Sequence, residues 1–146
     1  MARNADSIRL LLSQGPMASR QVLEKTGISQ PTVSRALAAL GGEVVRIGSG
    51  PSIRYALRDS SRGFASTPIF RVGDDGLIRQ IGTLVPVRPD GFVMVQTVGV
   101  AIHSDGLPWW LFDMRPQGYL GRAYASRHAA GLGLPANPEL WGGAEV

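Results

Sequence analysis

A short run of polar and basic side chains between positions 29 and 35 is the strongest candidate for a binding site in this sequence. Gln30 and Arg35 are residue types that can form two hydrogen bonds at once, with adenine and with guanine respectively. Pro31 suits the first turn of a helix, where a missing N–H costs little. We therefore interpret this segment as the exposed start of a helix that reads bases, with candidate DNA contacts at Ser29, Gln30, Pro31, Thr32, Ser34 and Arg35.

The rest of this helix must hold those side chains outward. Apolar residues recur at the spacing of one buried helical face, at Val33, Ala36, Leu37 and Leu40. At about 100° per residue, Pro31, Ser34, Arg35 and Ala38 point the opposite way. The pattern predicts a helix that ends at Gly41-Gly42, with Ser29 as its N-cap.

Two shorter helices are predicted before it. Asp6 to Gln14 carries an apolar stripe of Ile8, Leu11 and Leu12, with Asp6 as a cap or first-turn acid. Ser19 is placed to cap a second helix, whose inward residues are Val22 and Leu23. Gly27 then supplies a left-handed backbone that ends this helix, and Ile28 fills the corner.

The stretch GISQPTVSRALAAL resembles the turn and recognition helix of bacterial winged helix-turn-helix regulators. The alternative is a helical hairpin whose polar face is merely solvated, because such hairpins are common.

Two strands, Val44 to Ile47 and Ile53 to Leu57, are predicted after the third helix and would form the wing of such a domain. In the second strand Ile53, Tyr55 and Leu57 alternate with Arg54, Ala56 and Arg58, so we expect one buried face and one basic, exposed face. Arg46, Arg54 and Arg58 are therefore candidates for phosphate contacts. The alternative is an ordinary hairpin with solvated arginines.

Charge is concentrated in the same part of the chain. Residues up to Arg62 include nine basic and four acidic side chains, whereas the remainder has six basic and seven acidic ones, within a net charge of +4. Clustered positive charge is typical of a surface that contacts phosphate.

Strand patterns return after a polar stretch that fits a linker. Ile69 to Val72 and Leu77 to Val87 predict a hairpin, and Phe92 to Val98 a third strand, buried on both faces. Gly82 predicts a bulge or a close backbone approach. The cluster at 109–112, WWLF, is expected to be buried, and Tyr119, Leu120, Ala123 and Tyr124 to share one face of a C-terminal helix.

These patterns predict an α+β fold. Three helices and a β-wing form a winged helix-turn-helix domain at residues 1–60, and a linker follows at 61–68. A small β-meander or partial barrel with a C-terminal helix occupies residues 69–135, and residues 136–146 form a tail.

The segments IGTLVPVRPDGFVMVQ and WWLFDMRPQGYLGRAYA are similar to the N-terminal subdomain of HipA-family serine/threonine kinases, the toxin kinases of toxin–antitoxin systems. The YjjJ-type branch, which has an added N-terminal winged helix, fits the domain order best. Met114, Arg115 and Gln117 depart from the Leu-Leu-Pro-Glu-Gly-like signature that the family carries here. The resemblance implies a kinase domain or an antitoxin protein as partner.

The chain itself lacks the residues for phosphoryl transfer. Lys25 is its only lysine, and neither a P-loop nor an H-R-D-type loop is present. The triplet His103, Ser104 and Asp105 is interpreted as a polar turn. With no cysteine and two distant histidines we expect no metal and no other cofactor. We therefore expect a non-enzymatic chain.

Other classes are disfavoured by composition. No apolar run approaches the length of a membrane span, about 20 residues, and no secretory signal precedes the first helix, so we expect a soluble, cytoplasmic protein without membrane contact.

Three functions remain open. The first is sequence-specific binding of double-stranded DNA in transcriptional regulation or autoregulation, with a homodimer as one arrangement. The second is a non-catalytic N-terminal fragment of a kinase toxin, which an exposed WWLF cluster would favour because a missing domain would leave apolar surface uncovered. The third is a module in which the helix and wing bind a protein.

Overall fold

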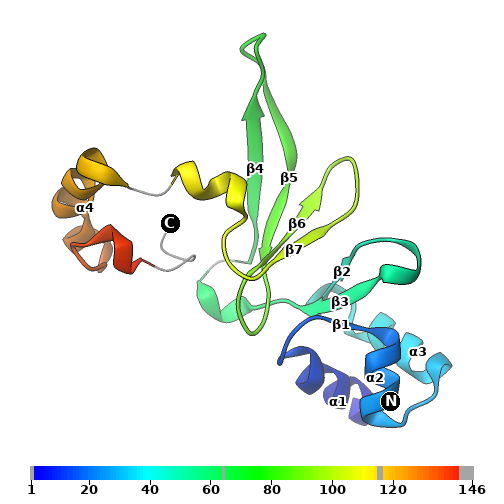
Figure 1. Cartoon of the computed structure of the whole chain (residues 1–146). Coiled ribbons are helices and arrows are strands. Elements are labelled where there is room, and N and C mark those ends of the chain that lie inside the picture. Colours follow the sequence, from blue (N-terminus) through cyan, green and yellow to red (C-terminus); the bar gives the residue numbers. More distant parts are fainter. Residues whose placement is uncertain (1, 64, 115–116, 142–146) are drawn as a thin grey trace. The chain divides into compact units, whose positions relative to one another are not determined.

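The chain separates into two compact units, Met1–Asp105 and Gly106–Val146, in the computed structural model shown in Figure 1. The structure describes residues 2–63, 65–114 and 117–141. The predicted linker at 61–68 lies inside the first unit, where it contributes to a 3₁₀ turn, Ser60–Arg62, and to the start of a strand at Thr67. The division into domains at that linker stays a prediction.

Three helices build the first core: α1 (Ala2–Leu12), α2 (Ser19–Thr26) and α3 (Gln30–Leu40). The predicted stripe of α3 is buried, which confirms the helical periodicity of that segment. α1 begins four residues earlier than predicted, and Asp6 lies within it, where it pairs with Arg9 instead of capping the helix. The buried side chains that join the three helices include Ile8, Leu12, Val22, Val33, Leu37 and Leu40.

The turn between α2 and α3 follows the sequence closely. Gly27 adopts the left-handed conformation with φ 67° and ends α2, while Ile28 packs against the core. At the other end of α2 the prediction was wrong by one residue, because Ala18 occupies the N-cap position and Ser19 is the first helical residue. The side-chain oxygen of Gln21 accepts a hydrogen bond from the Ala18 amide at 2.9 Å, which replaces the expected serine cap.

The first unit contains two antiparallel sheets. One has the order β1-β3-β2, with β1 (Met17–Ala18), β2 (Val44–Ile47) and β3 (Arg54–Leu57). The other has the order β4-β5-β6-β7, with β4 (Thr67–Val72), β5 (Ile78–Pro86), β6 (Phe92–Gln96) and β7 (Ile102–Ser104). The meander is therefore present, whereas closure toward a barrel stays a prediction.

Two short strands were not predicted from the sequence. β1 has two residues, and Met17 pairs with Tyr55 of β3. β7 includes His103 and Ser104, so the interpretation of these residues as a polar turn was wrong. A two-residue strand leaves no alternation in the sequence, and its identity depends on a partner 38 positions away.

Gly82 lies where β5 pairs with the end of β6. A Cβ atom at this position would meet the Val95 carbonyl oxygen at 2.4 Å and the methyl carbon of Met94 at 2.5 Å. The neighbouring strand β4 shifts register between Ile69 and Phe70 at the same level. The prediction of a bulge or close approach at this glycine is confirmed.

The two sheets of the first unit share a core. Val45, Ile47 and Ala56 from the first sheet pack against Val85 and Val93 from the second and against Val87, which follows β5. Ala56 is 0% exposed, so the face of β3 that was predicted to be exposed and basic is covered at its centre. That prediction was wrong because the covering residues are about 30 to 50 positions away in the sequence and leave no mark on the local alternation.

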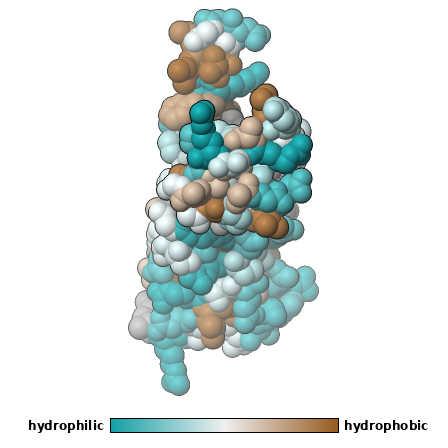
Figure 2. Space-filling model, turned by 90° about the vertical axis from the view of Figure 1, so that its left-hand side faces the viewer, coloured by the Kyte–Doolittle hydropathy of each residue, from teal (hydrophilic) through white to brown (hydrophobic). Residues whose placement is uncertain are grey.

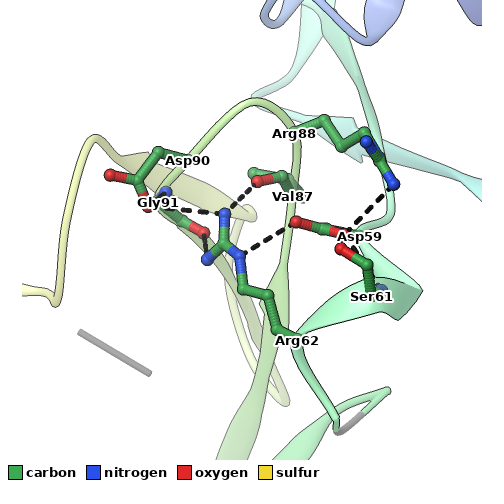
Figure 3. Close-up of polar contacts among 7 residues, drawn as sticks. All are labelled: Asp59, Ser61, Arg62, Val87, Arg88, Asp90 and Gly91. Atoms are coloured by element: carbon green, nitrogen blue, oxygen red, sulfur yellow. Dashed lines mark hydrogen bonds and ion pairs between the residues drawn. The ribbon is translucent and has the colours of Figure 1, made fainter. Parts of the chain in front are cut away.

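A polar joint connects the segment after β3 to the turn between β5 and β6 (Figure 3). Arg62 donates from Nε to a carboxylate oxygen of Asp59 at 3.0 Å, and from its terminal nitrogens to the carbonyls of Val87 at 2.6 Å and Gly91 at 2.8 Å. Both side chains are largely buried, at 12% exposed for Arg62 and 7% for Asp59. The guanidinium also lies over the Phe92 ring at 5.3 Å.

The hairpin of β4 and β5 extends past the end of β6 (Figure 1). The part of β5 that precedes Gly82 pairs only with β4 among the described strands. Apolar side chains at the free end of this hairpin are exposed, as Figure 2 shows at the top of the view. They include Phe70, Val72, Leu77 and Ile78.

The second unit consists of a 3₁₀ helix (Trp109–Met114), helix α4 (Gly118–Leu132) and a 3₁₀ turn (Pro138–Leu140). The buried face of α4 is made of Gly121, Ala125 and Ala129, and Trp141 packs against it. Trp141 also donates from Nε1 to the Pro135 carbonyl at 2.7 Å, so this part of the predicted tail is folded.

The aromatic residues before α4 and on it are more exposed than expected. Trp109 is 80% exposed and Trp110 is 37% exposed, while Leu111 is buried; the side chain of Phe112 lies outside the described set. On α4, Tyr119, Leu120 and Tyr124 are exposed. The prediction that the WWLF cluster is buried was therefore wrong for its two tryptophans.

Among the described residues, no helix is long and apolar enough to cross a bilayer. The same residues contain no group of three or more side chains suited to hold a metal ion.

Candidate nucleic-acid interface

The outward side of α3 is the centre of the candidate interface. Because Val33, Ala36 and Leu37 are drawn into the core, the intervening positions face away from it. Ser29 precedes the helix in an extended conformation with ψ 149°, and Pro31 occupies the first turn. The exposed residues on this side are Ser29, Gln30, Pro31, Ser34, Arg35 and Ala38, and Thr32 is partly exposed.

Local hydrogen bonds hold the start of α3. The hydroxyl groups of Ser29 and Thr32 lie 3.0 Å apart, in place of a serine cap onto the helix backbone. Arg35 donates from Nε to the Pro31 carbonyl at 3.2 Å, which draws its side chain toward the N-terminal end of the helix. Its terminal guanidinium nitrogens have no partner among the described residues and can bind a ligand.

A groove of about 410 Å³ runs between α3 and the sheet β1-β3-β2. Gln30 and Ser34 line it from the helix, and Arg46 lines it from β2. Arg46 lies directly across from Tyr55 in the register of β2 and β3, so both side chains share the face that points toward the helices. The structure thus brings three of the predicted site residues to one surface.

A second hollow of about 410 Å³ adjoins the first, since Ser19, Gln30 and Tyr55 line both. It adds Arg20 and the loop residues Gly50 and Pro51. Arg20 is exposed and pairs with Glu24 at 3.0 Å. Among the described residues, no acidic side chain lines either hollow.

Arg54 lies on the opposite face of β3 from Tyr55. It is exposed and lies near His103 of β7. Burial lowers the pKa of the His103 imidazole below its usual value; the charge of Arg54 lowers it further, while Asp105 acts in the opposite direction.

Arg58 is also outside the groove. Its amide donates to the Glu43 carbonyl at 2.8 Å, its backbone bridges to Val87, and its Nε is buried without a hydrogen-bond partner among the described residues. The structure therefore places Arg54 and Arg58 away from the groove that contains Gln30, Ser34 and Arg46.

Ser19 and Tyr55 were not predicted as site residues. Ser19 was interpreted as a helix cap, and Tyr55 was assigned to a buried face although it remains partly exposed. The signal that could have identified Tyr55 is the pairing of the two strands, because a hairpin in this register sets Tyr55 beside Arg46.

Comparison with known proteins gives two family matches. Residues 64–146 match the family described as YjjJ-like toxin, middle domain. Residues 8–43, which include the end of α1 and the whole of α2 and α3, match the family described as bacterial regulatory protein, arsR family. The N-terminal helices are thus a helix-turn-helix of the type found in bacterial regulators.

One similar protein is Toxin YjjJ from Escherichia coli (strain K12). It is 39% identical to the chain over 132 residues, which are 90% of this chain and 30% of that protein. The chain therefore spans less than a third of the length of this relative. No solved structure matches the chain.

Proposed function

The chain belongs to the family of YjjJ-like toxins, and from that premise we propose that its N-terminal part is a winged helix-turn-helix that binds double-stranded DNA. In this proposal α3 enters the major groove and the hairpin of β2 and β3 is the wing. The proposed role is transcriptional regulation or autoregulation.

The observation that carries this proposal is the groove that brings Gln30, Ser34 and Arg46 together without an acidic side chain. A helix that presents polar side chains at its exposed N-terminal end, next to a strand with an arginine, matches the way such domains dock on DNA. The basic excess of the chain up to Arg62 supports the same interpretation, because phosphate contacts supply much of the affinity.

The residues of the groove and of the exposed start of α3 have distinct proposed roles. Gln30 and Arg35 contact base edges, with Ser29, Pro31, Thr32 and Ser34 at the same helix end, and Arg46 contacts backbone phosphate. Arg54 and Arg58 stay candidates for phosphate contacts from the sequence. Because they lie outside the groove, their positions support this role less than the position of Arg46 does.

The proposal is tested by titration of a labelled duplex with the full chain at several salt concentrations. We expect the logarithm of the affinity to fall linearly with the logarithm of the salt concentration. Arg35→Ala should change the preference between duplex sequences, at a cost of about 1–3 kcal/mol at the affected base pair. Affinity that is independent of salt would contradict DNA binding and would favour a protein as the partner of this surface.

A second candidate function is favoured by the exposure of Trp109, at 80%, and of Trp110. Large exposed apolar side chains mark surfaces that another domain or protein covers. We propose as the alternative that the chain is the N-terminal portion of a HipA-like serine/threonine kinase toxin, in which this surface contacts a catalytic domain or an antitoxin protein. The chain alone is proposed to have no kinase activity.

One measurement separates these candidates, and a second tests the oligomeric state of the DNA-binding form. The reading frame beyond codon 146 should continue into residues that bind Mg²⁺ and phosphate if the chain is part of a kinase. The mass of the chain in solution, with and without duplex DNA, tests whether it binds as a homodimer, since paired half-sites are common for such domains. An authentic stop codon together with tight DNA binding would support the regulator and contradict the kinase-fragment candidate.

A further inference from the structure

His103 is held between the two sheets of the first unit. It lies in β7, directly across from Val93 of β6, and residues paired in this way project from the same face of a sheet. Val93 packs against Ile47 and Ala56 of the first sheet. The His103 side chain therefore points toward the hairpin of β2 and β3, and only 9% of it is exposed.

The imidazole of His103 is poorly placed to carry a positive charge. Its Nε2 is buried and has no hydrogen-bond partner in the described part of the chain. Burial lowers the pKa of His103 below its ordinary value of 6.5, and the charge of Arg54 on β3 lowers it further. Asp105 acts in the opposite direction, but it lies 3.8 Å from Nδ1 and its side chain is fully exposed, so water weakens the attraction. The ring is therefore neutral at pH 7 and above.

The same region joins the hairpin of β2 and β3 to the second sheet. The Gly48 amide donates to the carbonyl of Ala101, the residue before β7, at 3.0 Å. Arg54 lies across from Ile47 in the register of the hairpin, on the face that packs against the second sheet. Arg46 precedes Ile47 on β2 and projects from the other face, where it lines the groove beside α3. These contacts therefore also determine where Arg46 lies.

A proton on this imidazole places a second positive charge near Arg54, in a site that is largely closed to water. Burial of a charge and a neighbouring like charge both disfavour the charged form. The cost is removed if the protonated ring reaches water. Because His103 faces the hairpin of β2 and β3, this requires the hairpin to move away from β7.

We propose that His103 is a pH-sensitive contact, which holds the hairpin of β2 and β3 against the second sheet while it is neutral and releases the hairpin when it is protonated. The released form binds a proton more tightly than the closed form. The hairpin is therefore held above pH 6.5 and is released as the pH falls through the lower pKa of the closed form.

Release of the hairpin moves Arg46, so we expect acid to weaken DNA binding. Without such a contact the opposite result is expected, because added positive charge strengthens binding to phosphate. The effect on DNA rests on the proposed function, whereas release of the hairpin does not.

The test is a pH titration of the full chain by nuclear magnetic resonance. His103 and His128 are the two histidines of the sequence, so His128→Gln assigns both imidazole signals. We expect His103 to titrate with a pKa below 6.5, and the hydrogen-exchange protection of the Gly48 amide to fall between pH 7.5 and pH 5. The protection should fall by about tenfold for each unit by which the pKa is lowered. In His103→Gln the protection should not depend on pH.

DNA binding is measured on the same proteins by anisotropy of a labelled duplex at pH 7.5 and pH 5, at constant ionic strength. Affinity should fall at pH 5 in the wild type and in His128→Gln, the matched control, and should not fall in His103→Gln.

A His103 imidazole that titrates with a pKa at or above 6.5 would overturn the proposal, and so would Gly48 protection that is the same at both pH values. Both results come from the wild type, so they decide the point even if His103→Gln does not fold. Loss of Gly48 protection in a chain that binds no duplex at either pH would support the contact and contradict the proposed DNA binding.

Discussion

Arg46 and Arg54 are exposed arginines of one hairpin that lie on opposite faces of it. Only Arg46 shares the groove with α3. We predict that Arg46→Ala weakens binding to all duplex sequences similarly and lowers the slope of the salt dependence by about one, as loss of a single phosphate contact does. Arg54→Ala is the matched control and should leave both quantities close to wild type. The measurement is fluorescence anisotropy with two unrelated duplexes.

A larger loss with Arg54→Ala than with Arg46→Ala would reverse the assignment of the two faces. A change that depends on the duplex sequence would instead make Arg46 a base contact.

Gly82 is a residue at which a single added methyl group should destabilise the fold. Its added Cβ would lie 2.4 Å from a backbone oxygen of β6, which cannot move without disturbing the sheet. We predict that Gly82→Ala lowers the free energy of unfolding by about 1–3 kcal/mol, the range for overpacking. Urea unfolding followed by circular dichroism measures this difference.

Gly42→Ala is the control for that substitution, since nothing lies within 4 Å of its added Cβ and its φ is not in the left-handed region. It should unfold within about 0.5 kcal/mol of wild type. Equal stability of the Gly82 variant would mean that β5 and β6 can separate more easily than their pairing indicates.

At the scale of elements, the features that depend only on the residue pattern of one segment could be predicted from the sequence. The buried face of α3 follows from Val33, Ala36, Leu37 and Leu40 alone, so the outward position of Gln30 and Arg35 could be predicted without the rest of the fold. The left-handed end of α2 at Gly27 could be predicted for the same reason.

What depends on distant partners could not be predicted. The covered face of β3 requires Val85 and Val87, and β1 is a strand only because Tyr55 pairs with Met17. The exposed state of Trp109 contradicts the general tendency of apolar clusters to be buried within the same chain. In each case the outcome depends on residues outside the segment whose pattern gave the prediction.

The joint at Asp59 has a consequence for stability at low pH. Burial would raise the pKa of Asp59, but hydrogen bonds from Ser61 and Arg62 and the charge of Arg88 together hold it below its ordinary value of 3.8. A carboxylate with a lowered pKa in the folded state stabilises the protein above the unfolded-state pKa and loses this effect as the pH falls through the folded-state value. We predict that the free energy of unfolding declines as the pH is lowered below 3.8.

Asp59→Asn isolates this contribution, because other acids contribute equally to both proteins. At pH 7 the variant should be destabilised by about 3 kcal/mol, since Arg62 would remain largely buried without its charge partner. Its difference from wild type should shrink as the pH falls below the ordinary value of Asp59. A difference that stays constant with pH would mean that the joint is held by the carbonyl contacts of Arg62 and not by the carboxylate.

At the scale of the whole molecule, the two compact units should lose their structure independently. The second unit, Gly106–Val146, has a small buried cluster of Ala125, Ala129 and Trp141. Removal of a large buried aromatic side chain costs about 3–5 kcal/mol, which is as much as such a small core supplies. We predict that Trp141→Ala unfolds α4 and leaves the helix-turn-helix folded.

The measurement is the helical signal in circular dichroism together with the affinity for duplex DNA. The variant should lose a helical signal equivalent to the 15 residues of α4 while its DNA affinity stays within about twofold of wild type. Trp109→Ala is the matched control, because that side chain is 80% exposed and its removal should change neither quantity. A parallel loss of DNA affinity in Trp141→Ala would show that the second unit takes part in the interface, and the groove beside α3 would then describe only part of it.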